Sequence, residues 1–186
     1  MLLRNAVSKK LVYSVGFIEY GKEVGMYITA YRVDERLVHG QIMTSWLKYL
    51  QLKRIIVVDN QLAQDDFMST VLSMSAPAGV NIEILSVDET AKRLMHSDSD
   101  ERTMLLFKRI SAALELSKKL EGTNIPITEL NLGNLGSLPG RVQITKNIFL
   151  SDEEKEQIKS LQDMGVNVFL QMLYTDQAIP VSQVLL

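Results

Sequence analysis

The stretch Arg54-Ile55-Ile56-Val57-Val58-Asp59 is a run of branched apolar residues that ends on a carboxylate. A continuous apolar run, rather than an alternating one, is typical of a strand that is covered on both faces, as in parallel sheets. Amphipathic stretches on either side of it predict helices near 41–50 and around 65–75. This alternation predicts an α/β domain with an open, mainly parallel, twisted sheet and helices on both of its faces.

The same alternation continues along the rest of the chain. Further strands are predicted at 27–33, 80–85, 104–107, 129–132, 143–149 and 166–173, and a further helix at 111–120. Two helix starts carry a capping box, in which a hydroxyl serves a free amide and a carboxylate reaches back. They are Ser86 with Glu89, and Ser151 with Glu154 before a helix to Met164. Because no linker or repeat divides it, the segment 26–186 is predicted to be a single domain.

The composition argues against several classes of function. Twenty basic and 22 acidic residues leave a formal net charge of −2 over 186 residues, without the basic excess of a nucleic-acid partner. The absence of cysteine excludes disulfides and thiolate metal sites, and only His39 and His96 are present, so neither a metal nor a cofactor is expected. No apolar run approaches the roughly 20 residues that span a bilayer, so direct membrane insertion is not expected.

Residues 1–25 differ in pattern from the rest of the chain. The apolar patch at 11–18 is short, and Glu19 and Lys22 come after it, unlike the pattern of a signal peptide. The codons for Lys22-Glu23-Val24 can spell a bacterial ribosome-binding site at a suitable distance before Met26. The segment 1–25 is therefore predicted to be an N-terminal extension or a mis-set start, with an additional strand or loose arm as the alternative.

The loop after the predicted first strand concentrates chemistry: Arg32-Val33-Asp34-Glu35-Arg36-Leu37-Val38-His39-Gly40-Gln41. In open parallel sheets, ligands gather beyond the carboxyl ends of the strands. The guanidinium groups of arginines and the free backbone amides at a helix start bind phosphate well, and Gly40 would let the backbone approach such a ligand. The imidazole of His39 is a competent nucleophile, and Asp34 or Glu35 could keep one ring nitrogen protonated. The pattern predicts a phosphate site and leaves a phosphohistidine as one possibility.

These ten residues closely resemble the motif R-(I/V)-D-(D/E)-R-L-(I/V)-H-G-Q of the IIB components of the mannose/fructose/sorbose phosphotransferase system. The resemblance continues in Trp46 and in the segments 55–59, 76–80, 85–90, 105–108, 129–134 and 151–154. It covers essentially Met26 to the C-terminus and leaves the first 25 residues unmatched.

The resemblance implies a specific activity and specific partners. Members of the family accept a phosphoryl group from a phosphohistidine of the IIA component and pass it to a sugar held by the membrane components IIC and IID. The chain would then be a protein-N(pi)-phosphohistidine–sugar phosphotransferase in the cytoplasm, recruited to the membrane by its partners. The sugar stays open among mannose, fructose, sorbose and N-acetylgalactosamine or a related amino sugar, and the oligomeric state stays open too.

The resemblance also implies roles for single residues. The phosphorylated histidine of the family falls on His39, with the δ1 nitrogen as the expected attachment point. The arginines Arg32 and Arg36 would clamp the phosphoryl oxygens, Asp34 would orient an arginine or the ring, and backbone amides would cradle the group. The phosphate-binding or orienting residues implied in this way are Arg32, Asp34, Arg36, Gly40 and Gln41.

Two other interpretations of the chain are possible. One is a regulatory module whose anion loop never passes the group to sugar, and the other is an aspartyl-phosphate receiver centred on Asp59. The acidic pair and lysine of receivers are not evident, which favours a structural role for Asp59. Among the remaining polar residues, His96 is expected to be exposed and Glu35 to be a solvated partner of an arginine. The segment Gly133–Gly136 lacks the lysine of a P-loop and is expected to be a turn.

Overall fold

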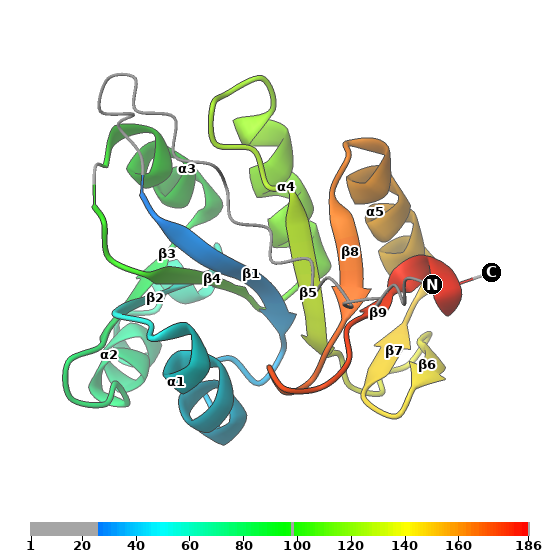
Figure 1. Ribbon diagram of the computed structural model, residues 1–186, viewed down its shortest axis with the longest axis horizontal. Helices are drawn as coiled ribbons and strands as arrows, with labels where there is room; N and C mark the ends of the chain where they lie inside the picture. The colour runs from blue at the N-terminus through cyan, green and yellow to red at the C-terminus, as the bar shows by residue number, and fades with distance from the viewer. Residues whose placement is uncertain (1–25, 98, 186) are drawn as a thin grey trace, which may run out of the picture.

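A seven-stranded sheet forms the centre of the molecule, in the order β3-β2-β4-β1-β5-β8-β9 (Figure 1). The structure is a computed structural model that describes residues 26–97 and 99–185, so the extension predicted at 1–25 lies outside the described residues. The strands of the sheet are β1 (Ile28–Asp34), β2 (Arg54–Val58), β3 (Asn81–Leu85), β4 (Thr103–Phe107), β5 (Glu129–Asn134), β8 (Asn167–Leu170) and β9 (Ile179–Pro180). All neighbours pair in parallel except β9, which is antiparallel to β8. The predicted open, mainly parallel sheet is confirmed.

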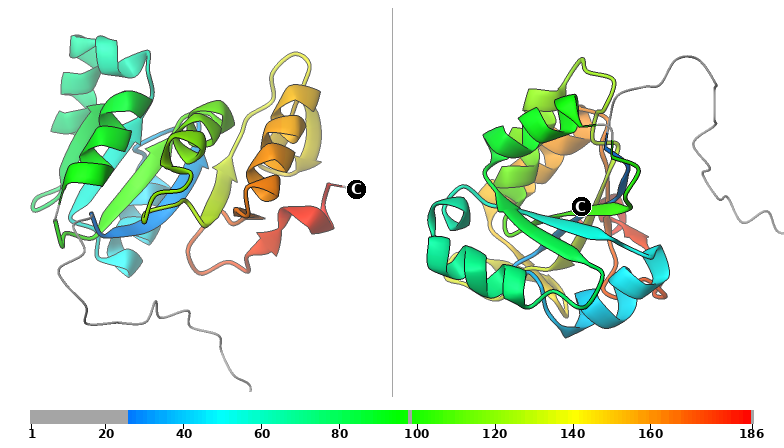
Figure 2. Two further views of the ribbon diagram at one scale, coloured as in Figure 1. Left: turned by 90° about the horizontal axis from the view of Figure 1, so that it is seen from above. Right: turned by 90° about the vertical axis from the view of Figure 1, so that its left-hand side faces the viewer.

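Helices cover both faces of this sheet, as predicted (Figure 2). One apolar core lies between the sheet and the helices α3 (Val87–His96), α4 (Ile110–Leu120) and α5 (Asp152–Asp163). A second core lies on the opposite face, under η1 (Ile42–Trp46), α1 (Leu47–Leu50), η2 (Leu62–Gln64) and α2 (Asp66–Met74). A last short helix, η3 (Val181–Gln183), comes after β9.

The signals that act over a few residues are confirmed. The apolar residues of β2, from Ile55 to Val58, have no exposed surface, as expected of a strand covered on both faces. Both capping boxes form: Ser86 and Glu89 open α3, and Ser151 and Glu154 open α5. Each box satisfies backbone amides that the first helical turn leaves without a partner.

Two predicted strands are wrong in detail, and one predicted helix is confirmed with an unexpected geometry. The strand expected at 143–149 is a two-stranded antiparallel hairpin outside the main sheet, formed by β6 (Val142–Thr145) and β7 (Ile148–Leu150). The strand expected at 166–173 does not close the sheet, because β8 ends at Leu170 and β9 adds one more edge. The helix expected at 41–50 exists, but Ile42–Trp46 has π-helical geometry, which is often found at functional sites.

The order of the strands places two loops side by side at one edge of the sheet. β1 lies between β4 and β5. From β1 the chain continues to η1 and α1 on one face, whereas from β5 it continues through the β6–β7 hairpin to α5 on the other. Such a divergence beyond the carboxyl ends of two neighbouring strands is the position at which α/β proteins generally bind their ligands.

Candidate active site

The turn after β1 is held in a conformation that its sequence does not favour. The amide of Leu37 donates to the carbonyl of Asp34 over 3.0 Å, and Leu37 has a φ of 55°. This left-handed conformation is unfavourable for a residue with a side chain and is often found at functional sites. The side chain of Leu37 is buried in the core beside Ile42 and Trp46, which offsets the strain. Sequence reasoning missed this role, because leucine carries no signal for a positive φ.

The buried carboxylate of Asp34 organises the site. Its Oδ2 accepts hydrogen bonds from Arg32 at 2.8 Å and from Nη2 of Arg36 at 2.9 Å. Its Oδ1 accepts from the backbone amide and Nε of Arg36, at 3.2 and 3.0 Å. Asp34 thus orients Arg36 with a two-pronged interaction, in line with its predicted role, and its part in any transfer stays a prediction.

The guanidinium of Arg32 lies beneath the site rather than in it. The side chain has no exposed surface and stacks on the ring of Trp46, 4.7 Å from the ring centroid. Burial lowers the pKa of Arg32, and the charge of Asp34 opposes that shift. The acceptors of its hydrogen bonds are Asp34, Asn131 and the carbonyls of Gln171 and Met172. Nη1 and Nη2 are thus turned to protein groups, whereas Nε is buried and has no hydrogen-bond partner among the residues described. Contact of Arg32 with phosphoryl oxygens would require the side chain to leave these partners, and it stays a prediction, as does the orienting role.

Arg36 is the arginine that a ligand can reach. Its side chain is 33% exposed. Nε and Nη2 are engaged by Asp34, whereas Nη1 makes no hydrogen bond to any residue that the structure describes. Arg36 can therefore direct Nη1 of its guanidinium at an anion while Asp34 binds Nε and Nη2.

The side chain of His39 is 18% exposed, so the ring is partly accessible to solvent. Its Nδ1 lies 2.7 Å from the carbonyl of Leu37 and must donate, because a carbonyl only accepts. In the neutral ring Nε2 then carries the lone pair. Nε2 has no hydrogen-bond partner within the described part of the chain and lies 3.9 Å from Oδ2 of Asp34. In this arrangement the Leu37 carbonyl, not a carboxylate, keeps Nδ1 protonated, and the expectation that Asp34 or Glu35 holds a ring nitrogen protonated stays a prediction.

Gly40 and Gln41 begin the helix that comes after His39. A Cβ atom added at Gly40 would meet nothing within 4 Å, so the space beside this glycine is open. The first amides of a helix have no acceptor within it and attract anions. The Oε1 atom of Gln41 is buried and has no hydrogen-bond partner among the residues described. Whether either residue binds phosphate stays a prediction.

Glu35 is not the solvated residue that the sequence suggested. Its Oε2 accepts from the amide of Gly136 at 2.7 Å, and its Oε1 pairs with Nη2 of Arg141 at 2.7 Å. These contacts join the loop after β1 to the loop after β5. No feature of the sequence pointed to this role of Arg141, because Glu35 lies far from it along the chain.

The other polar residues singled out from the sequence have structural roles. Asp59 is buried, and its Oδ1 accepts from the amides of Gln61 and Leu62 at 3.0 and 2.9 Å, which fixes the turn that leads into η2. This confirms the structural role that was expected of it. His96 is exposed, as predicted, and is the last residue of α3 rather than part of a loop.

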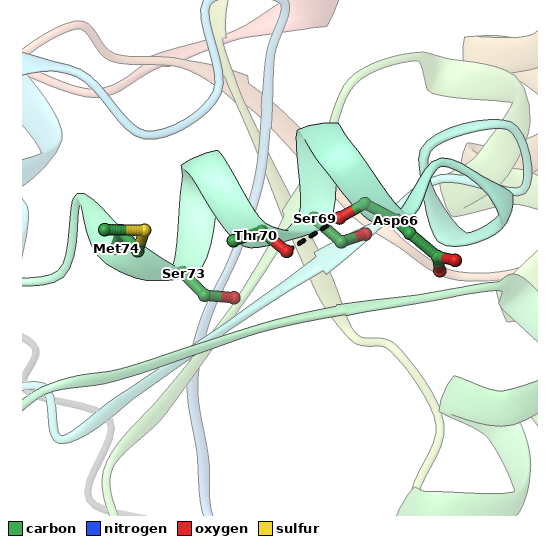
Figure 3. Close-up of a pocket in the computed structure, with 5 residues that line it drawn as sticks. All are labelled: Asp66, Ser69, Thr70, Ser73 and Met74. Carbon is green, nitrogen blue, oxygen red and sulfur yellow. Dashed lines mark hydrogen bonds between the residues drawn. The ribbon is translucent and has the colours of Figure 1, made fainter.

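A hollow on α2 offers less chemistry than the loop after β1 (Figure 3). Its lining residues are Asp66, Ser69, Thr70, Ser73 and Met74. Each of its three hydroxyls donates to a backbone carbonyl, and Asp66 is the one charged group that remains. Within residues 26–97 and 99–185 there is no group of three His, Asp or Glu side chains placed to hold a metal ion. In the same residues, no helix has the length and apolar character that crossing a bilayer requires.

Comparison with known proteins gives concordant matches. The family described as "PTS system sorbose subfamily IIB component" matches residues 28–186. The fructose-specific EIIB component of Bacillus subtilis (strain 168) is 34% identical over 162 residues, covering 86% of this chain and 96% of that protein. The mannose-specific EIIAB component of Escherichia coli (strain K12) is 30% identical, covering 81% of this chain and 46% of that protein. The crystal structure of the IIB domain of the sorbose permease from Klebsiella pneumoniae superimposes with a TM-score of 0.77, at 28% identity, over 85% of this chain and 95% of that one.

Proposed function

Because the chain belongs to the sorbose subfamily of IIB components of the phosphotransferase system, we propose that it accepts a phosphoryl group from the IIA component on His39. It then passes the group to a sugar held by the membrane components IIC and IID, at the cytoplasmic face of the membrane. The observation that carries this proposal is the position of His39. The ring is partly exposed beyond the carboxyl ends of β1 and β5, in the same loop as Arg36 and at the start of a helix.

The first transfer joins a nitrogen of His39 to phosphorus while the bond from phosphorus to the donor's imidazole breaks. Attack by Nδ1 requires its lone pair, so the ring must leave the Leu37 carbonyl and carry its proton on Nε2 instead. Asp34, 3.9 Å from Nε2, is the nearest carboxylate to stabilise that proton. Arg36 and the amides near Gly40 would balance the phosphoryl charge. In the second transfer His39 is the leaving group: the bond between nitrogen and phosphorus breaks, the sugar oxygen bonds to phosphorus, and the hydroxyl proton passes to the imidazole that is set free or to solvent.

The proposal is tested by supplying labelled phosphoenolpyruvate, the general phosphotransfer proteins and IIA. We expect label on the chain that is lost in acid and retained in alkali, as a phosphohistidine requires. Membranes that contain IIC and IID should then convert it to sugar phosphate. Label released by hydroxylamine would indicate an acyl phosphate instead, and label that never reaches any sugar would indicate a regulatory module.

Replacing Arg36 by lysine should slow phosphoryl acceptance by about 10²-fold. Lysine keeps the charge but cannot bind Asp34 with two nitrogens and direct a third at the phosphoryl group. Single-turnover transfer from phosphorylated IIA measures the effect. A rate equal to that of the unchanged protein would mean that Arg36 is a surface residue without a role in transfer.

Replacing Gly40 by alanine should separate function from stability. Since a Cβ there meets no atom within 4 Å, the free energy of unfolding should stay the same or rise by up to about 1 kcal/mol. Transfer to His39 should nevertheless slow, because the methyl group would occupy space beside the amides that bind the phosphoryl group. Urea denaturation and single-turnover transfer, measured on one preparation, check both halves. Unchanged transfer would show that no ligand approaches over this glycine.

A further inference from the structure

Arg141 connects three segments of the chain although its side chain is only 8% exposed. Its Nη1 donates to the carbonyl of Gly136 at 2.8 Å, and its Nε donates to Glu154 at 2.8 Å. Its Nη2 pairs with Glu35 at 2.7 Å. Burial opposes the charge of Arg141, but the hydrogen bonds to Glu154 and Glu35 outweigh it and raise the pKa above the ordinary range of arginine. The side chain is therefore a permanent cation between three parts of the fold.

Glu35 binds the guanidinium of Arg141 from the loop that comes after β1 and carries His39, residues 35–39, named here the active loop. Besides the ion pair with Arg141, its carboxylate accepts the amide of Gly136, and its own amide donates to the carbonyl of Asn134 at 3.1 Å. Both the main chain and the side chain of Glu35 are thus fixed to the segment after β5. Glu35 comes directly after Asp34, whose carboxylate aligns Arg36.

The other side of the connection is anchored on a helix. Glu154 closes the capping box of α5 with Ser151, and α5 is 12 residues long. Arg141 therefore braces the active loop against an element that packs into the core through Ile158 and Leu161. A site residue held through such a chain of bonds has little freedom to shift.

We propose that Arg141 and Glu35 form a clamp, named here the Glu35–Arg141 clamp, that positions the active loop for phosphoryl transfer. Neither residue contacts the reacting atoms; both are positioning residues that act through Asp34, Arg36 and His39. The expected effect of the clamp on the rate of phosphoryl transfer rests on the proposed function. The expected effect on the position of the His39 ring does not depend on that function.

The kinetic consequence arises from the short path between the clamp and the ring. Only three residues, 36–38, separate Glu35 from His39. A loop released at Glu35 shifts the pair of Asp34 and Arg36 together with the ring. Phosphoryl transfer depends mainly on alignment, and a misplacement of about 1 Å reduces the rate by about 10²-fold.

The test compares Glu35→Gln, Arg141→Gln and the double variant in single-turnover transfer from phosphorylated IIA. Each single variant should lower the rate at saturating donor by about 10- to 100-fold without changing the half-saturating donor concentration. The double variant should be no slower than the slower single variant, because the ion pair between Glu35 and Arg141 is already lost in each single variant. The ring nitrogen resonances of His39 should shift in both single variants, which a residue that only stabilises the fold would not cause.

Lys119→Gln is the matched control, since it removes an exposed ion pair with Asp88 on the far helices. It should leave the transfer rate and the His39 resonances unchanged. Additive losses in the double variant, or normal rates with unmoved resonances, would overturn the clamp. If the unchanged protein takes no label at all, the proposed function fails, and the His39 resonances alone decide about the clamp: coincident shifts support it and unmoved resonances refute it.

Discussion

Replacing His39 by alanine should abolish phosphoryl acceptance from IIA, with the rate falling by at least about 10⁴-fold. The reason is that the group is carried covalently on the ring, so no neighbouring donor or amide can replace it. The fold should survive, because the ring is partly exposed and, among the residues described, makes one hydrogen bond, to the Leu37 carbonyl. Such a bond contributes about 1 kcal/mol. Quantitative labelling with phosphorylated IIA measures the loss, and urea denaturation shows that the chain is folded.

Two variants make this experiment specific. In His39→Asn the side-chain amide can still donate to the Leu37 carbonyl, yet it cannot carry a phosphoryl group, so it should be as inactive as alanine and as stable as histidine. In His96→Ala the second histidine of the chain is lost, and labelling should be unchanged, because His96 lies exposed at the end of α3. Label that persists in either His39 variant would place the acceptor elsewhere, and label lost in His96→Ala would do the same.

The part of the fold that could be predicted from the sequence rests on signals between near neighbours. The apolar run of β2 and the hydroxyl–carboxylate pairs that open α3 and α5 each act within four or five residues. Their outcome hardly depends on the rest of the chain. The placement of His39 at the sheet edge results from the same signals, since a strand that ends before it and a helix that begins after it leave it in the loop between.

The environment of Arg32 could not be predicted in this way. Its acceptors Asn131, Gln171 and Met172 lie 99, 139 and 140 residues further along the chain. Beside a histidine, an arginine suggests an anion ligand. Only the placement of β1 next to β5, and near the segment after β8, reveals that this one is covered. The same limit applies to Leu37, whose left-handed turn is imposed by the burial of its own side chain.

The burial of Arg32 depends on a residue that was expected, from the sequence, to lie in a turn. Gly133 lies in β5, and a Cβ atom there would come closer than 3.0 Å to Cζ, Nη1 and Nη2 of Arg32. Real Cβ atoms essentially never make contacts that short. The guanidinium stacks on Trp46 and is bonded to Asp34, so withdrawing from such a Cβ would cost it these contacts. A side chain at 133 and the buried arginine therefore exclude each other.

Replacing Gly133 by alanine should lower the free energy of unfolding by about 3–5 kcal/mol, because it displaces a buried charge from its partner Asp34. For a chain of this size that corresponds to a melting temperature lower by about 6–20 °C. Phosphoryl transfer should slow as well, since Asp34 would lose the donor that fixes it against Arg36. Urea denaturation measures the first effect and single-turnover labelling the second.

The cause of that loss can be isolated with two comparisons. Gly136→Ala is the matched control in the next loop, because its Cβ would meet Oε2 of Glu35 at an ordinary 3.4 Å, and it should cost less than about 1 kcal/mol. In an Arg32→Ala background, Gly133→Ala should cost little, since the guanidinium that it would strike is gone. If Gly133→Ala is as stable as the unchanged protein, or equally harmful with and without Arg32, the guanidinium does not need the space that glycine leaves. In that case Arg32 would be free to leave its buried position, and direct contact with the phosphoryl group would be open to it.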